Sequence, residues 1–240
     1  MFRNSARAVT PTQASHIVAT LAPWEAHLRQ ETPYGALLIL GSAMLLVTGA
    51  IHPGSIPFDD NAALARMALV DAFAHSLAIL GTWLVLVGLV GLSRMLGLTR
   101  VAVMAALVAF ALAASGVMVA AALDGFVVPK LAEQWMDADN ISRGELKQLI
   151  RFSVLIASSL TRVYLLLGAV AIALWSWAIY RDRQSSSLPW VGAVVGVAGI
   201  ATLIGGPAYV STHEVLALVA GQAVWMVLAA LLTIRRDVAA

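Results

Sequence analysis

The stretch that decides the fold is residues 67–93, MALVDAFAHSLAILGTWLVLVGLVGLS, which are almost continuously apolar. A helix needs roughly 20 such residues to cross a hydrocarbon core of about 30 Å. Lipid offers backbone groups no water to bond, so a stretch of this kind must be helical or belong to a closed barrel. Its apolar residues do not alternate with polar ones, which excludes a barrel strand. The stretch therefore predicts a transmembrane helix.

The rest of the chain repeats this pattern. Of its 240 residues, 60% are hydrophobic and only 12% are charged, and the mean hydropathy is +0.87. A soluble domain carries about 25% charged residues. We therefore expect an all-α, polytopic membrane bundle with about six transmembrane helices, surrounded by a lipid bilayer. The six apolar blocks are 34–51, 67–93, 101–123, 162–180, 190–206 and 214–234.

Composition also excludes several classes of site and partner. The chain has no cysteine, which rules out disulfides, thiolate metal sites and cysteine nucleophiles. Its net charge of +2 is small, and we predict no nucleic-acid partner. We see no fixed-period repeat and divide the chain into a tail, residues 1–33, and a six-span membrane domain, residues 34–240.

The basic residues predict an orientation. Short loops on the cytoplasmic side of a membrane protein are enriched in Lys and Arg. Placing the tail, the second and fourth turns and the C-terminus on one side gives that side nine basic residues, and both termini then face the cytoplasm. We expect a multi-pass protein of the cell inner (plasma) membrane. The nine are Arg3, Arg7, Arg29, Arg94, Arg100, Arg181, Arg183, Arg235 and Arg236.

The tail has an apolar pattern of its own. Ile17, Leu21, Trp24 and Leu28 recur at helical spacing, which indicates an amphipathic helix lying on the inner membrane surface. The alternative is a disordered tail.

The fourth helix is predicted to be longer than the membrane. We expect residues 125–141 to form an outward-facing loop, and Ser142 and Glu145 have the spacing of a capping box. A helix from Ser142 to Tyr180 would be about 58 Å long at 1.5 Å per residue. Its first half should therefore extend beyond the bilayer on the outer side, or lie along it.

Ionisable residues within the spans gather at one depth. His75 lies 19 residues from Arg94, and Arg162 lies 19 residues from Arg181, so both are about 28 Å from the inner end of their helices. Five other residues fall at similar depths, within a layer about 8 Å thick near the outer edge of the hydrocarbon. Charges inside spans are costly, which makes this layer the candidate site. It contains His52, Asp71, His75, Asp124, Arg162, His213 and Glu214.

This layer has the composition of a metal or ligand site. Asp71 and His75 are four residues apart and share a helix face. Imidazole and carboxylate are the usual ligands of zinc and other transition metals. We predict a transition metal or haem held by His52, His75 and His213. The residues predicted to bind a ligand are Asp71, His75, Asp124, Arg162 and Glu214.

Structural explanations compete with this prediction. His52 precedes Pro53 and can simply end the first span. Asp71 lies in the first turns of the second span, where a carboxylate suits the positive end of the helix. Asp124 and Gly125 resemble a helix stop.

Arg162 and Glu214 also allow more than one explanation. Arg162 could be the counter-charge of Asp71 or Asp124, bind an anionic headgroup, or extend along the helix to the outer surface. Glu214 has capping-box spacing from Ser211.

A stripe of small residues follows the fourth span. Gly192, Gly196 and Gly199 fit the small-xxx-small pattern of close helix contacts. We expect packing within the bundle; the alternatives are a homo-oligomer or a membrane partner.

The turn before this stripe resembles one found in bacterial multi-span membrane families of unknown function. In those families a basic, serine-containing turn leads into Leu-Pro, an aromatic or basic residue and a glycine-rich span. The resemblance covers roughly residues 160–205 and implies no catalytic residues. It is carried by Arg181, Ser185, Leu188, Pro189, Trp190 and Gly192.

Three functions are compatible with these patterns. The first is a periplasm-facing polar pocket that binds a small ligand, a metal or a lipid headgroup. The second is a metal-dependent membrane enzyme, a hydrolase or oxidoreductase, using His52, His75 and His213. The third is a structural or accessory subunit whose long fourth helix docks a partner.

Overall fold

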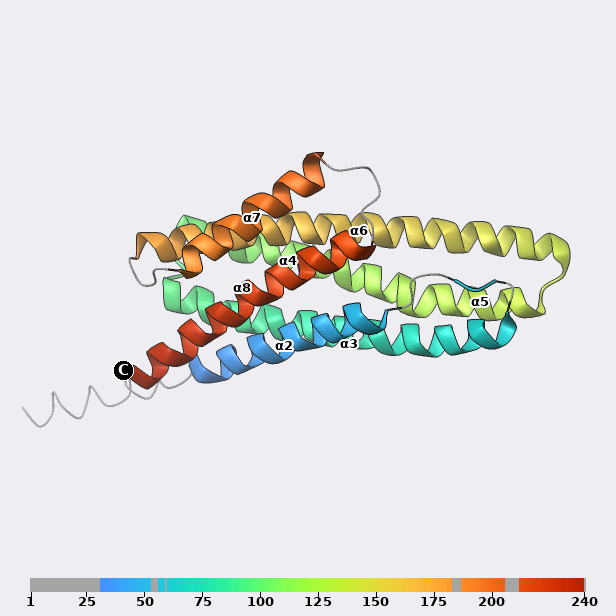
Figure 1. Cartoon of the computed structure of the whole chain (residues 1–240), viewed down its shortest axis with the longest axis horizontal. Coiled ribbons are helices and arrows are strands. Elements are labelled where there is room, and N and C mark those ends of the chain that lie inside the picture. Colours follow the sequence, from blue (N-terminus) through green and yellow to red (C-terminus); the bar gives the residue numbers. More distant parts are fainter. Residues whose placement is uncertain (1–30, 53–55, 59, 183–186, 206–211, 240) are drawn as a thin grey trace, which may run out of the picture.

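The described part of the chain is almost entirely helical (Figure 1). The computed structural model describes residues 31–52, 56–58, 60–182, 187–205 and 212–239. The tail for which we predicted an amphipathic helix lies outside these residues. No strand occurs among them, as expected for an all-α protein.

Five helices are long and apolar enough to cross a membrane, which is the architecture of a multi-pass membrane protein. The sixth apolar helix, α7, is shorter than the others in this set. The helices are α2 (Glu31–Ile51), α3 (Asn61–Leu96), α4 (Val101–Ala122), α5 (Val128–Asp137), α6 (Asn140–Arg181), α7 (Leu188–Gly205) and α8 (Thr212–Ala239), with a π-helical turn, η1 (Leu123–Val127), between α4 and α5.

The long helix predicted from Ser142 to Tyr180 is confirmed, but its start differs in detail from the prediction. Helix α6 has 42 residues, about 63 Å at 1.5 Å per residue. Its N-cap is Asp139, whose carboxylate accepts hydrogen bonds from the backbone N–H groups of Ile141 and Ser142 at 3.0 and 2.8 Å. The predicted capping box at Ser142 is therefore wrong, because Asp139 already satisfies the free amides of the first turn.

The predicted loop 125–141 is also wrong, because most of it is helical. The chain passes from α4 through η1 into α5 without leaving helical geometry, so Asp124 and Gly125 do not stop the helix. Pro129 lies in the first turn of α5. A proline there removes a hydrogen bond that the π-helical turn has already rearranged, which explains why the helix tolerates it.

Three helical segments form an extension beyond the end of α2 (Figure 1). They are the first part of α3, α5 and the first part of α6. Their contact surface is a small apolar core that contains Leu64, Met67, Val128, Ala132 and Ile150. Helix α3 alone is 36 residues, about 54 Å, so α3 and α6 both exceed a hydrocarbon core of about 30 Å.

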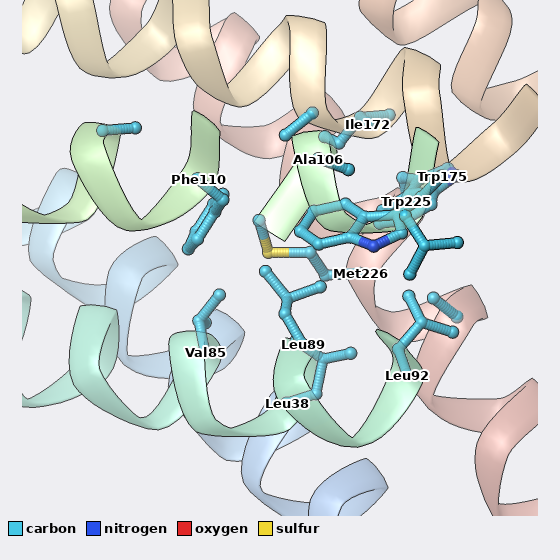
Figure 2. Close-up of a cluster of buried hydrophobic side chains, with 14 of the residues drawn as sticks. Leu38, Val85, Leu89, Leu92, Ala106, Phe110, Ile172, Trp175, Trp225 and Met226 are labelled. Carbon is cyan, nitrogen blue, oxygen red and sulfur yellow. The ribbon is translucent and has the colours of Figure 1, made fainter. Parts of the chain in front are cut away.

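The main core joins α2, α3, α4, α6, α7 and α8, and Figure 2 shows part of it. The rings of Trp175 and Trp225 stack with centroids 6.0 Å apart, and Phe110 packs against Trp175 at 6.1 Å. The indole N–H of Trp175 donates to Ser93 at 3.0 Å. This core holds α3 and α6, the two helices that continue into the extension, in a fixed relation.

Glycines allow the closest helix contacts. A Cβ on Gly41 of α2 would lie 2.6 Å from the carbonyl oxygen of Gly81 on α3. The predicted glycine stripe on α7 contacts α6 and α8: a Cβ on Gly192 would lie 1.8 Å from the Ser176 hydroxyl and 2.4 Å from the Trp225 indole nitrogen. Packing of this stripe within the bundle is thus confirmed for Gly192.

Two interhelical contacts gather the basic turns at one end of the bundle. Arg100, before α4, forms an ion pair with Asp182, directly after α6. Arg94, in the last turn of α3, donates to the hydroxyl of Tyr34 at 3.0 Å, near the start of α2. The sequence had assigned the turns around Arg94, Arg100 and Arg181 to one side, and these contacts place them at one end.

Candidate metal site of histidines and aspartates

Four residues of the predicted layer converge where α2 ends beside α3 and η1. His52 follows the last residue of α2, and its backbone N–H still donates to Thr48 at 3.0 Å. Asp71 and His75 lie on consecutive turns of α3, and Asp124 lies on η1. We call His52, Asp71, His75 and Asp124 the His–Asp cluster.

Local packing fixes this convergence. The hydroxyl of Thr48 donates to the carbonyl oxygen of Ala74 at 3.1 Å, which ties α2 to α3 one residue before His75. Gly125 faces His75 from η1: a Cβ at Gly125 would lie only 2.3 Å from the Cβ of His75. The contact therefore requires glycine, and it brings the neighbouring Asp124 to the imidazole.

The π-helical turn has a specific role in this geometry. A π-turn inserts one residue into a helix and rotates the residues that follow, and such turns are frequent at functional sites. Here it occurs at the residue whose carboxylate faces the two histidines. The expectation that Asp71 lies in the first turns of its helix is wrong, since α3 begins ten residues earlier at Asn61. Asp71 therefore has no helix-end role.

The described hydrogen bonds indicate the tautomer of His75. Its Nδ1 lies 2.9 Å from the backbone carbonyl oxygen of Asp71, which can only accept, so Nδ1 carries a proton. In a neutral ring, Nε2 then presents a lone pair, and this atom lies 3.4 Å from Oδ2 of Asp124. In that protonation state two acceptors face each other, and a cation between them would relieve the repulsion.

The same carboxylate oxygen faces the second histidine. Nε2 of His52 lies 3.4 Å from Oδ2 of Asp124 and 3.8 Å from Oδ1 of Asp71. The two imidazole rings meet edge to face with centroids 5.0 Å apart. One donor atom from each of His52, Asp71 and His75 lies within 4.8 Å of the others.

These separations fit a small metal ion. A tetrahedral zinc with bonds of about 2.05 Å requires ligand atoms about 3.3 Å apart, close to the two 3.4 Å separations. Oδ1 of Asp71 is buried, and its nearest basic atom is Nδ1 of His75, at 3.1 Å, where the alignment for a hydrogen bond is poor. A haem between His52 and His75 does not fit, because rings in edge contact leave no room for the macrocycle.

Access to the cluster is from one side. Asp71 and His75 are buried, whereas the side chains of His52 and Asp124 are 32% and 25% exposed. A ligand would therefore approach the edge formed by His52 and Asp124.

The remaining predicted residues are placed as follows. The guanidinium of Arg162 donates to the carbonyl oxygen of Leu203, linking α6 to α7. Glu214 lies in the first turn of α8 and is half-buried. His213 belongs to the same turn, but its side chain lies outside the described residues. Of the three histidines predicted to hold a metal, the structure thus brings His52 and His75 together. Two aspartates, Asp71 and Asp124, lie beside them.

Sequence reasoning missed how the chain reaches this geometry. The spacing of Asp71 and His75 predicted their shared face, and depth counting grouped them with His52 and Asp124. The role of Gly125 was missed, since a glycine after an aspartate is typical of a helix end. Comparisons with known proteins add no assignment: no family model, no curated protein and no solved structure matches this chain.

Proposed function

We propose that this membrane protein binds a divalent transition-metal ion, with zinc as the best fit, at the His–Asp cluster. The observation that carries the proposal is the pair of 3.4 Å separations that join Oδ2 of Asp124 to Nε2 of His52 and of His75. The ligands would be Nε2 of His52, Nε2 of His75 and Oδ2 of Asp124, because the His75 nitrogen nearest to Asp71 is Nδ1, which carries a proton. Asp71 would orient His75 from its backbone carbonyl and neutralise charge with its carboxylate, as outer-shell carboxylates do.

Electrostatics support this assignment. Two ionised carboxylates in a partly buried site beside lipid are costly unless they are neutralised. A divalent ion with two neutral imidazoles gives a complex with no net charge. Three protein ligands leave one coordination position, the arrangement of catalytic rather than structural zinc sites. This open position favours a metal-dependent enzyme, a hydrolase or an oxidoreductase, as the second candidate function.

The direct test is the metal content of the purified protein. We expect stoichiometric metal in the unmodified chain, and loss of most of it in His52→Ala and Asp124→Asn. His52 ends a helix and is partly exposed, so its replacement disturbs the fold least. Asp71→Asn should weaken binding about 10–100-fold, as outer-shell substitutions do. Glu133→Gln is the control, since it removes an exposed carboxylate of the extension.

A metal-free protein that takes up neither Zn²⁺ nor Co²⁺ would refute the proposal. Equal metal content in Asp124→Asn and Glu133→Gln would refute the assigned ligands.

We further propose that α7 is the sixth span, that both termini face the cytoplasm and that the membrane is the bacterial inner membrane. The basic residues that the structure gathers at one end support this orientation. The absence of native cysteine makes a clean test available. A membrane-impermeant maleimide added to intact spheroplasts should label Glu145→Cys in the extension and spare Arg181→Cys. The reverse pattern would overturn the orientation.

A further inference from the structure

An apolar groove lies beside the His–Asp cluster, between α3 and the α4–η1 segment. Its lining is Ser76, Ile79, Leu80, Trp83, Met118 and Phe126. The only polar member is Ser76, whose hydroxyl already donates to Ala72 of its own helix at 2.8 Å. Leu80, Trp83 and Phe126 are about half exposed, so the groove opens on the outside of the bundle.

The groove and the cluster share two helices and follow each other in depth. Ser76 directly follows His75 in the sequence, and Ile79 lies one helical turn beyond His75, toward the Arg94 end of α3. Met118 precedes Asp124 by less than two turns on α4, and Phe126 follows it on η1. The His–Asp cluster and the groove thus follow each other along α3 and along the α4–η1 segment, in the order of the head and chain of an amphiphile.

The bilayer determines what occupies the groove. Both walls belong to helices long and apolar enough to span a membrane, so hydrocarbon chains surround them. A lipid chain gains little free energy by moving from the bilayer into an apolar groove, because both surroundings are apolar. Within the groove, only close packing distinguishes one lipid chain from another. Selectivity must therefore come largely from the head.

Charge decides the class of head. Zinc with Asp71, Asp124 and two neutral imidazoles is already neutral, so an anionic head would add an uncompensated charge to a partly buried site. An uncharged oxygen donor adds none and can take the open coordination position. The exposed edge at His52 and Asp124 is the side from which such a donor would enter.

We propose that the metal of the His–Asp cluster takes, at its open position, the uncharged ester carbonyl or hydroxyl oxygen of an amphiphile whose chain lies in the α3–α4 groove. This inference rests on the proposed metal site. It assigns the substrate or ligand class as a neutral single-chain lipid or the equivalent part of a larger lipid.

The experiment uses the full chain loaded with Co²⁺ in detergent, with monoolein as the probe. The visible d–d spectrum of Co²⁺ reports its coordination. Monoolein should shift the spectrum saturably, whereas glycerol, which has the head without the chain, should not do so at the same concentration. Lysophosphatidate, with a similar chain and an anionic head, should shift it only at higher concentration.

Groove variants separate chain binding from metal binding. Ile79→Trp fills the groove and should weaken the monoolein response by about ten-fold, equivalent to about 1.4 kcal/mol, with Co²⁺ uptake unchanged. Phe126→Ala removes one wall of the groove without adding bulk, and it should also weaken the monoolein response. Leu112→Trp, on an exposed part of α4 outside the groove, is the matched control and should respond like the unmodified chain.

The outcomes are distinguishable. Failure to bind Co²⁺ refutes the metal site and this inference with it. Co²⁺ binding with no response to monoolein refutes this inference alone. Equal responses from Ile79→Trp and Leu112→Trp refute the groove, and a stronger response to lysophosphatidate than to monoolein refutes the neutral head.

Discussion

Replacement of Gly125 by alanine should disrupt the metal site through one methyl group. The new Cβ would lie 2.3 Å from Cβ of His75 and 2.7 Å from Cγ, where ordinary contact begins at 3.4 Å. η1 and α3 must therefore separate locally by about 1.1 Å. Overpacking of this kind costs about 1–3 kcal/mol. The higher helix propensity of alanine stabilises the helix by at most about 1 kcal/mol, so the net effect should be destabilising.

The consequence for metal binding is larger than for stability. Ligand atoms must hold their positions within about 0.5 Å for a productive site. A shift of His75 of about twice that amount should lower Co²⁺ or Zn²⁺ affinity by about 10–100-fold, measured by competition with a chelator. The midpoint temperature of thermal unfolding in detergent should fall by about 2–4 °C for each kcal/mol of unfolding free energy that is lost.

Gly116→Ala is the matched control. It lies on α4 in the same continuous helical segment, and its Cβ would meet nothing closer than Leu160 at 3.9 Å. We expect unchanged metal affinity and equal or slightly higher stability. If Gly125→Ala and Gly116→Ala behave alike in both assays, the proposed packing of η1 against His75 is wrong.

Other substitutions test the remaining framework. Gly192→Ala should lower thermal stability by several degrees, because its Cβ would overlap two side chains, whereas Gly144→Ala, with nothing within 4 Å, should not; equal melting points would contradict the α6–α7 contact. The backbone hydrogen bond from Ser142 lowers the pKa of Asp139 below its ordinary value. Its stabilisation of α6 should therefore be complete above about pH 4 and be lost as pH falls through the lowered pKa; hydrogen exchange of the first turn should show this in the unmodified chain and not in Asp139→Asn. Asp182→Asn should cost no more than about 1 kcal/mol, because the ion pair with Arg100 is partly exposed; a larger loss on thermal unfolding would give this pair a role beyond a surface ion pair.

Much of this fold could be predicted because membrane helices follow directly from apolar length. The blocks at 34–51, 67–93 and 214–234 lie within α2, α3 and α8, and a helix longer than the bilayer was expected from residue 142 onward. The errors occurred where polar residues continue a helix. Asp60 caps α3 by accepting from the backbone amides of Ala62 and Ala63, so the helix begins before its apolar block does.

The candidate site was predictable in membership more than in geometry. Helical spacing joined Asp71 to His75, and depth alone grouped these residues with His52 and Asp124. Which residues meet depends on rotation about each helix axis, and the π-helical turn changes that rotation at Asp124. A one-residue insertion of this kind has no sequence signal as strong as an apolar block. The need for glycine at position 125 becomes clear only when the structure places His75 against it.

With the Arg94 end of the bundle at one membrane surface, as proposed above, the position of the His–Asp cluster along α3 also determines its electrical environment. His75 lies about 28 Å from Arg94, close to the full hydrocarbon thickness of about 30 Å. A cation arriving from the extension would cross less than about a tenth of the membrane field, worth about 0.2 kcal/mol per charge at 100 mV, whereas one arriving from the Arg94 end would cross nearly all of it, worth about 2 kcal/mol. Metal occupancy that is insensitive to voltage would thus identify the side from which the ion enters.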